Sequence, residues 1–120
     1  MSYVTKDSGK RKVYSSNMVR DTDENKPRFD LLMPKIVPYK DQPLTRFAEL
    51  MARGAQKYTE RNWELAEGVE ELERFKASAL RHLLQWYNNE QDEDHMAAVM
   101  FNLTGAEYVK WKLKNTNSKK

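Results

Sequence analysis

The stretch from Val69 to Leu113 constrains the fold most, because it has the pattern of two long helices joined by a short polar turn. In its first segment, VEELERFKASALRHLLQWY, apolar residues recur at steps of three or four, the spacing of one buried helix face. The second segment, HMAAVMFNLTGAEYVKWKL, repeats the pattern, and no proline interrupts either one. The intervening NNEQDED favours a helix stop at its asparagines and a helix start at its acidic end. The sequence therefore predicts a helical hairpin.

This hairpin brings the only two histidines of the chain, His82 and His95, to the same level. The midpoint between them is at Asn88 and Asn89, so each lies about 10 Å from a bend centred there, at a rise of about 1.5 Å per residue. By helical spacing Asn102 shares the face of His95. We therefore expect the two imidazoles to face each other across the hairpin.

Four carboxylates crowd the bend beside these histidines: Glu90, Asp92, Glu93 and Asp94. Carboxylates and imidazoles that converge at one end of a helix pair are suitable ligands for a divalent cation. The alternative is that both histidines are core residues beside a solvated acidic turn. The sequence leaves both interpretations open.

The length of 120 residues allows one domain, and a mean hydropathy of −0.93 indicates a modest core. A chain this polar with two long amphipathic helices is expected to complete its core as a homo-oligomer. The absence of cysteine excludes disulfides and thiolate metal sites. We find no signal peptide and no run long enough to span a membrane, so we expect a cytoplasmic protein with no membrane partner.

The net charge of +3 is unevenly distributed. Residues 1–40 hold nine Lys/Arg and five Asp/Glu, and the last eleven residues hold five lysines and no acid. Residues 60–95 hold ten acidic and four basic residues. Basic ends either attract nucleic acid in a salt-dependent way or simply keep the ends soluble. The acidic centre argues against a duplex-binding surface, so no specific nucleic-acid partner is expected.

The chain before the hairpin divides into three segments. Residues 1–18 lack periodicity and are rich in Lys, Ser and Gly, which predicts a flexible tail. From Val19 onward four prolines predict an extended arm with a short helical turn at Phe29–Met33. The segment from Pro43 to Tyr58 predicts a helix with proline in its first turn. We therefore expect one helical domain over residues 19–114, followed by a basic tail over residues 115–120.

Several polar residues outside the hairpin are candidates for ligand contacts. Lys26 and Arg28 in the arm are placed to reach a phosphate, although solvated charges are the alternative. Glu49 lies within the apolar face of the 43–58 helix, either as a rim residue or as a buried ligand. The chain has no glycine-rich phosphate loop and no nucleophile elbow, so covalent catalysis is not expected.

Trp63 lies in a loop together with three polar residues, Lys57, Arg61 and Asn62. An aromatic ring in such company can stack on a base while the cations hold its phosphates. It can equally serve as a cover over the core.

Several stretches together resemble a known family: KPRFDLL, LTRFAELMARGAQKYTERNW, ALRHLLQW and the acidic bend leading into HMAAVMFN. From Val19 to Lys112 the chain is similar to phage- and prophage-borne dATP/dGTP diphosphohydrolase domain proteins, which are thought to be relatives of the MazG-like nucleotide pyrophosphohydrolases. The resemblance implies an all-α, oligomeric enzyme that depends on Mg²⁺, with Mn²⁺ as the substitute. Such an enzyme cuts a purine deoxynucleoside triphosphate into the monophosphate and pyrophosphate. With the proline-rich segment, the expected fold is a small helical bundle with a long extended N-terminal arm.

The MazG-like pattern pairs ExxE on one helix with ExxD on the next. Here Glu70 and Glu73 form an ExxE, while the bend offers Glu90 and Glu93 where the pattern has ExxD, with Asp94 one step on. The departure leaves open a site built with Glu49 and the histidines. The metal ligands are therefore expected among Glu49, Glu70, Glu73, Glu90 and Asp94.

The resemblance allows roles to be predicted for the remaining candidates. Catalytic groups are expected at the bend: Glu90, Glu93, Asp94, His82 and His95. Substrate contacts are expected from Lys26, Arg28, Lys57, Arg61, Asn62, Trp63, Arg81 and Asn102. The missing ExxD keeps a second hypothesis open, a nucleotide-sequestering protein without turnover. A third is a structural or nucleic-acid accessory protein that uses its basic ends.

Overall fold

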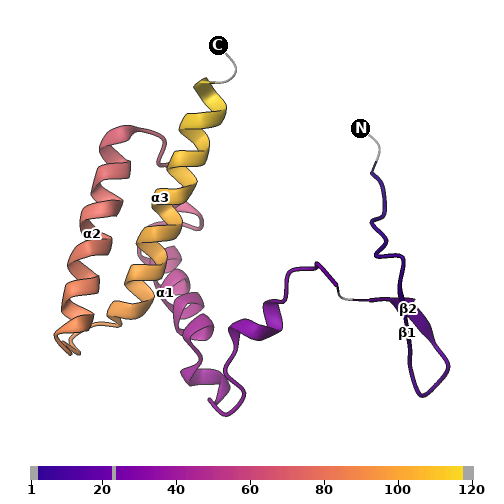
Figure 1. Cartoon of the computed structure of the whole chain (residues 1–120). Coiled ribbons are helices and arrows are strands. Elements are labelled where there is room, and N and C mark those ends of the chain that lie inside the picture. The colour runs from indigo at the N-terminus through magenta and orange to yellow at the C-terminus, as the bar shows by residue number, and fades with distance from the viewer. Residues whose placement is uncertain (1–2, 23, 118–120) are drawn as a thin grey trace. The chain divides into compact units, whose positions relative to one another are not determined.

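The computed structural model describes residues 3–22 and 24–117, which divide into two compact units, one ending at Leu32 and one beginning at Met33. The first unit contains a two-stranded antiparallel sheet and a 3-10 turn: β1 (Arg11–Val13), β2 (Val19–Asp21) and η1 (Phe29–Leu32). The second unit contains, in chain order, η2 (Tyr39–Asp41), α1 (Pro43–Lys57), η3 (Asn62–Leu65), α2 (Val69–Tyr87) and α3 (His95–Asn117) (Figure 1). The described residues are thus mostly helical, as predicted, with one small sheet.

The β-hairpin is an element that the sequence pattern does not predict. Its strands have three residues each and β1 is fully exposed, so no alternation of apolar and polar residues marks them. The turn uses Asn17 in a left-handed conformation with φ of 70°, a conformation that asparagine tolerates better than most residues. Asp21 accepts hydrogen bonds from the backbone N–H and the hydroxyl of Ser8. β1 therefore falls within the stretch predicted as a flexible tail, of which residues 1 and 2 lie outside the described residues.

The long extended arm is not confirmed. The proline-rich stretch contains β2 and two 3-10 turns, of which η1 matches the predicted helical turn at Phe29. In the second unit Gln42 fastens this stretch to the start of α1, because its side-chain amide donates to the carbonyls of Pro34 (2.8 Å) and Val37 (2.7 Å). Gln42 is buried, so these bonds satisfy carbonyls that a proline-containing segment cannot pair within a helix.

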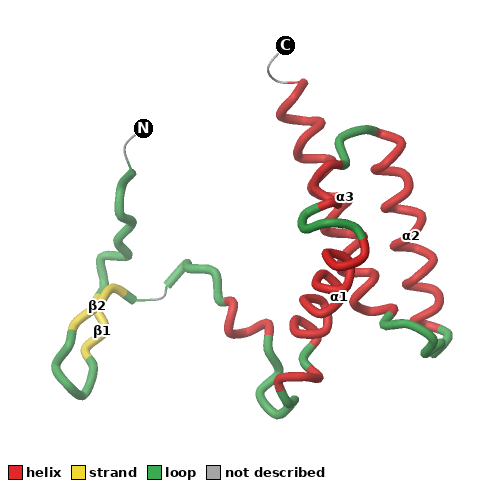
Figure 2. Tube along the Cα trace, turned by 180° about the vertical axis from the view of Figure 1, so that it is seen from behind, coloured by secondary structure: helices red, strands yellow, loops and turns green. Residues whose placement is uncertain are grey.

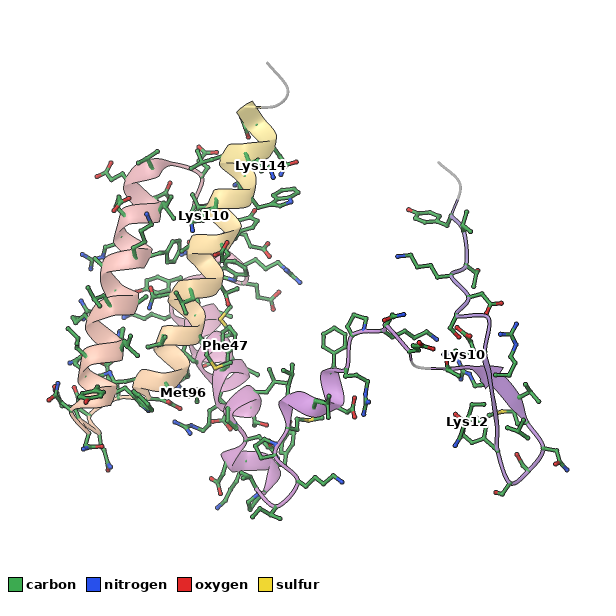
Figure 3. The ribbon with its side chains drawn as sticks, viewed as in Figure 1. Lys10, Lys12, Phe47, Met96, Lys110 and Lys114 are labelled. Atoms are coloured by element: carbon green, nitrogen blue, oxygen red, sulfur yellow. The ribbon has the colours of Figure 1, made fainter. Side chains whose placement is uncertain are left out.

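The predicted helical hairpin is confirmed, and its ends are set by side chains. At the start of α2 the Glu71 carboxylate accepts hydrogen bonds from the backbone N–H groups of Glu67 (3.0 Å) and Gly68 (3.1 Å). At its end Asn89 takes a left-handed conformation with φ of 62°, which stops the helix. α3 continues to Asn117, past the predicted boundary, and residues 118–120 of the predicted basic tail lie outside the described residues. Lys110 and Lys114 lie near its C-terminal end (Figure 3).

The three helices form a layer in which α3 contacts both α1 and α2, whereas α1 and α2 make no comparable contact with each other (Figure 2). The core between α2 and α3 centres on Leu72, Ala106 and Val109. A Cβ placed on Gly105 would lie 2.5 Å from Cε1 of Phe75, so glycine is what lets the Phe75 ring lie against α3. The core is therefore one layer thick, and large apolar side chains of α2 stay exposed: Val69, Leu80, Leu83, Leu84, Trp86 and Tyr87. Among the described residues, no helix is long and apolar enough to cross a membrane.

Candidate functional site

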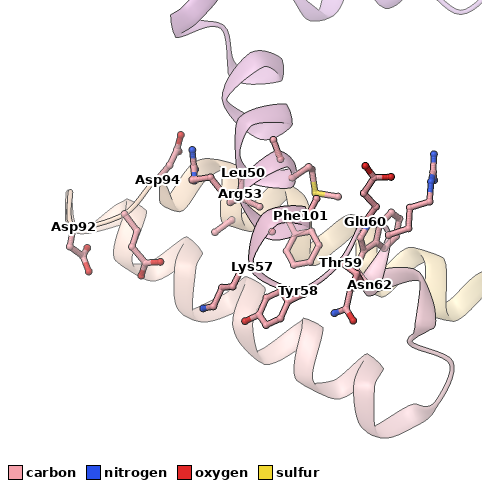
Figure 4. Close-up of a pocket in the computed structure, with 18 residues that line it drawn as sticks. Leu50, Arg53, Lys57, Tyr58, Thr59, Glu60, Asn62, Asp92, Asp94 and Phe101 are labelled. Atoms are coloured by element: carbon pink, nitrogen blue, oxygen red, sulfur yellow. The ribbon is translucent and has the colours of Figure 1, made fainter.

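A cavity of about 880 Å³ lies in the second unit between the C-terminal half of α1, the loop that follows it, and the residues just before α3. Three kinds of polar and aromatic side chain line it. The cations are Arg53, Lys57 and Arg61, the carboxylates are Glu60, Asp92, Glu93 and Asp94, and the aromatic rings are Tyr58, Trp63 and Phe101. Figure 4 shows the bend carboxylates at one end, Arg53 and Lys57 in the middle, and Tyr58, Phe101 and Asn62 toward the other end.

The aromatic end of the cavity is fixed by packing. The Trp63 ring meets Phe101 edge-on with ring centres 6.4 Å apart, and meets Tyr108 with centres 5.3 Å apart. The chain reaches this position because Arg61 adopts a left-handed conformation, with φ of 59°, directly before η3. Trp63 is half-buried and lines the cavity, so it serves as a cover over the core and as a wall of the cavity together.

The acidic end is held by an ion pair between α1 and the bend. Arg46 donates to both carboxylate oxygens of Asp94, from Nε at 2.8 Å and from Nη2 at 2.7 Å. The same carboxylate accepts a hydrogen bond from the backbone N–H of Ala97 at 3.1 Å, which caps the start of α3. These contacts, led by the Arg46 bond, lower the pKa of Asp94. Asp94 is therefore an ionised group that joins two walls of the cavity.

The two histidines meet as the sequence predicts. Nδ1 of His82 lies 2.9 Å from Nδ1 of His95, and the residues are 7% and 2% exposed. Nε2 of His95 lies 2.7 Å from Oδ1 of Asp92, and Nη2 of Arg81 lies 3.3 Å from Nε2 of His82. A chain of four polar groups thus leads from the surface of α2 through the hairpin to the mouth of the cavity, where Asp92 lies.

The direction of the hydrogen bonds in this chain follows from its two ends. A guanidinium only donates and a carboxylate only accepts. Arg81 therefore donates to Nε2 of His82, Nδ1–H of His82 donates to His95, and Nε2–H of His95 donates to Asp92. Burial and then the charge of Arg81 lower the pKa of His82, which keeps that ring neutral at physiological pH. The hydrogen bond from His95 lowers the pKa of Asp92, which keeps its carboxylate ionised.

A set of possible metal ligands lies around this histidine pair. One oxygen of Glu93 and one ring nitrogen each of His82 and His95 all lie within 4.8 Å of one another. Glu93 is exposed, and its carboxylate makes no hydrogen bond or ion pair among the described residues, so it is available. It lines the large cavity and a second hollow of about 280 Å³, which Glu90 and His95 also line. Two imidazoles and a free carboxylate fit a divalent cation.

The structure brings only part of the predicted site together. Lys57, Arg61, Asn62, Trp63, Glu93 and Asp94 line the cavity, and Glu90 and His95 line the adjoining hollow. Glu49 is exposed on α1 and lies outside both hollows. Asn102 is buried and its side chain donates to the carbonyl of Ala98 at 2.8 Å, within its own helix.

Two pairs of predicted residues lie elsewhere. Glu70 and Glu73 are exposed in the first turns of α2. From Glu73 to the last residue of that helix the distance is about 21 Å at about 1.5 Å per residue, so the ExxE and the bend belong to opposite ends of one hairpin. Lys26 and Arg28 belong to the first unit, where Lys26 pairs with Asp21 (3.4 Å) and Arg28 with Asp30 (2.7 Å).

Two arginines of the site were not predicted from the sequence, Arg46 and Arg53. Both lie on the face of α1 that also carries Leu50 and Lys57, at steps of three or four residues. That spacing is the signal that could have found them once Lys57 was a candidate. Tyr58 and Phe101 carried no such signal, because their place in the cavity depends on how α1 packs against α3.

These features define a helical protein whose cavity combines cations, carboxylates and aromatic rings beside a possible metal site. The comparison with known families gives the particular family. A family model described as dATP/dGTP diphosphohydrolase, N-terminal, matches residues 16–119, and the chain belongs to this family. No curated protein and no solved structure matches the chain.

Proposed function

We propose that this protein is a divalent-cation-dependent diphosphohydrolase that converts dATP or dGTP into the nucleoside monophosphate and pyrophosphate. The observation that supports this proposal best is the arrangement along the cavity, with the bend carboxylates at one end, Arg53 and Lys57 next, and Tyr58 and Phe101 farther on, where Glu60 also lies (Figure 4). A nucleotide bound to a cation has the same order, with the ion on the phosphates and the base at the far end. Membership of the dATP/dGTP diphosphohydrolase family supports the reaction class.

In the proposed reaction a water oxygen attacks the α-phosphorus, and the bond from that phosphorus to the oxygen bridging to the β-phosphorus breaks. Pyrophosphate leaves and the water gives up a proton. A bound divalent ion, which we expect to be Mg²⁺, would neutralise phosphate charge and acidify the attacking water. Glu93 is the carboxylate best placed to accept the proton or to hold the ion, because it lines the cavity without a partner among the described residues.

The cations of the cavity would bind the triphosphate. Arg53, Lys57 and Arg61 all line it from α1 and the following loop. Arg61 now pairs with Glu64 at 2.8 Å on the surface, and an exposed pair of this kind is worth only about 0–1 kcal/mol. Exchange of Glu64 for a phosphate therefore costs little. The rings of Tyr58 and Trp63 offer faces or edges for the base, and Asn62 offers an amide for its polar rim.

The four carboxylates of the bend would have different roles. Asp94 is held by Arg46 and caps α3, so its contribution is to fix the wall of the site. Asp92 is held by His95 at the mouth of the cavity. Glu90 and Glu93 remain to bind a cation. The predicted roles of Glu49, Glu70, Glu73, Lys26, Arg28 and Asn102 stay predictions.

The decisive experiment is to incubate the protein with each deoxynucleoside and ribonucleoside triphosphate in Mg²⁺ and to resolve the products by chromatography. We expect dAMP or dGMP together with pyrophosphate. Lys57→Ala should raise KM, because it removes a phosphate contact, whereas Lys76→Ala, an exposed lysine of α2 outside the cavity, should not. Release of orthophosphate, or full activity in chelator, would refute the mechanism.

A second candidate function is nucleotide sequestration without turnover. The observation that favours it is the commitment of Asp92 and Asp94 to His95 and Arg46, which leaves few free carboxylates for chemistry. Calorimetry would then show stoichiometric binding of dATP or dGTP, while chromatography would show unchanged nucleotide after prolonged incubation.

A further inference from the structure

The ligand atoms around the histidine pair differ chemically from those that Mg²⁺ prefers. The three side chains that approach within 4.8 Å of one another offer two imidazole nitrogens and one carboxylate oxygen. Mg²⁺ is bound through oxygen, whereas imidazole suits first-row transition metals, and two histidines with one carboxylate leave open positions on such an ion. We propose that His82, His95 and Glu93 form a resident site for a six-coordinate divalent transition-metal ion of the Mn²⁺, Fe²⁺ or Co²⁺ class. The purpose of this ion rests on the proposed function, but its binding does not.

The spacing of the nitrogens distinguishes between coordination geometries. Two nitrogens, each about 2.1 Å from one ion, are about 3.0 Å apart at a right angle and about 3.4 Å apart at a tetrahedral angle. The two Nδ1 atoms are 2.9 Å apart, which matches neighbouring positions of an octahedron. In the absence of the ion they share one proton. An ion there would take the place of that proton, which would move to Nε2 of His82, and the His82 ring would turn until both lone pairs point at the ion.

Asp92 holds His95, one of the three proposed ligands, in position. Its carboxylate accepts the Nε2–H of His95 at 2.7 Å and so fixes the tautomer in which Nδ1 is free to act as a ligand. Metal-binding histidines commonly use their second nitrogen in this way, and removing such a partner weakens metal affinity about 10- to 100-fold. The near-complete burial of His95 holds the ring in place.

Arg81 opposes the site from the other side. When Nδ1 of His82 binds an ion, its Nε2 must carry the proton, and Nη2 of Arg81, 3.3 Å away, then faces it donor against donor. Arg81 is exposed and can leave, but its departure costs the hydrogen bond. The structure therefore assigns Arg81 as a competitor of the ion, although the sequence predicts it as a substrate contact.

The test is a titration of the full chain with CoCl₂ in buffer without nucleotide, followed by visible absorption and calorimetry. We expect one equivalent to bind with the weak absorption of a six-coordinate ion, and at least tenfold more tightly than Mg²⁺. Glu93→Gln should weaken binding about tenfold, and because Glu93 is exposed this variant should keep its fold. His95→Ala should abolish binding, with circular dichroism reporting whether it folds.

Arg81→Ala should tighten Co²⁺ binding roughly fivefold, because it removes the opposing donor. The matched control is Arg74→Ala, which removes the same charge from an exposed position on the same helix and should change the affinity less than twofold. Unchanged affinity in Glu93→Gln, weaker binding in Arg81→Ala, or equal affinity for Mg²⁺ and Co²⁺ would overturn the site. Co²⁺ binding without nucleotide hydrolysis would refute the proposed function alone, and hydrolysis in Mg²⁺ without Co²⁺ binding would refute the site alone.

Discussion

At the scale of single residues, Asp94 has two structural tasks that can be separated. It accepts two hydrogen bonds from Arg46 and one from the start of α3. Arg46→Ala should destabilise the protein by about 1–2 kcal/mol, because the pair is only partly exposed. Asp94→Ala should cost about 1 kcal/mol more, since the helix cap is lost as well. Urea denaturation of both variants and of the double variant measures this, with Arg74→Ala, an exposed arginine of α2, as the control.

The opposite result for Asp94 would be informative. If Arg46→Ala lost no free energy of unfolding, and the double variant lost no more than Asp94→Ala, the ion pair would contribute nothing and the cap alone would matter.

The hydrogen bonds to the Glu71 carboxylate predict how the stability of the protein depends on pH. Its carboxylate accepts backbone hydrogen bonds from Glu67 and Gly68, and these lower its pKa in the folded chain. A group with a lowered folded pKa stabilises above its unfolded pKa and loses that stabilisation as the pH falls through the folded value. Glu71→Gln should therefore melt at a lower temperature than the parent at pH 7. The difference in melting temperature between the two proteins should narrow as the pH falls below roughly 4.3.

A melting series from pH 7 to about pH 3 on the parent and on Glu71→Gln tests this. Glu70→Gln is the control, because Glu70 lies in the same helical turn and its carboxylate accepts no backbone hydrogen bond from the residues that the structure describes. A difference in melting temperature that stays constant across the whole pH range would show that the carboxylate of Glu71 does not act through its charge.

At the scale of elements, two glycines in helices have opposite roles. A methyl group on Gly105 would lie 2.5 Å from the Phe75 ring, whereas one on Gly54 would meet nothing within 4 Å. Gly105→Ala should destabilise by about 1–3 kcal/mol through overpacking between α2 and α3. Gly54→Ala should stabilise by up to about 1 kcal/mol through helix propensity. Thermal melting of the two variants gives the signs, and two shifts of the same sign would contradict this view of the interface.

The same scale shows what could be predicted from the sequence. The bounds of α2, the start of α3 and the meeting of His82 with His95 followed from local spacing, because the two helices are adjacent in the chain. The pair of Arg46 with Asp94 could not be predicted, since its partners are 48 residues apart and depend on how α1 docks. The β-hairpin was missed because its strands are short, and because the left-handed backbone of Asn17 and the side chain of Asp21 define it rather than an apolar pattern.

At the scale of the whole molecule, one face of α2 is apolar and uncovered. Leu80, Leu84 and Tyr87 are 58%, 54% and 76% exposed and lie at steps of four and three residues on one helix face. We expect this face to be buried in a homo-oligomer, as the modest core predicts. Sedimentation should show an oligomer at micromolar concentration, and Leu84→Glu should convert it to a monomer.

The control is Leu65→Glu, because Leu65 is also an exposed leucine but lies on η3 rather than on α2. It should leave the oligomer intact. A parent protein that sediments as a stable folded monomer would contradict the prediction, and so would dissociation of the Leu65→Glu variant alone.

Because different helices form them, the two parts of the site, the histidine pair and the cavity, should stay assembled for different lengths of time. The histidine pair joins residues 13 apart inside the α2–α3 hairpin, whereas the cavity needs α1, whose ion pair with the bend spans 48 residues. Closing the longer loop costs more chain entropy, and of the two other helices of the layer α1 packs only against α3 to a comparable extent. Transient release of α1 therefore erases the cavity while His82 and His95 remain together. The open form would therefore release a bound nucleotide while the histidine pair still held an ion. The ion would then stay bound for longer than the nucleotide.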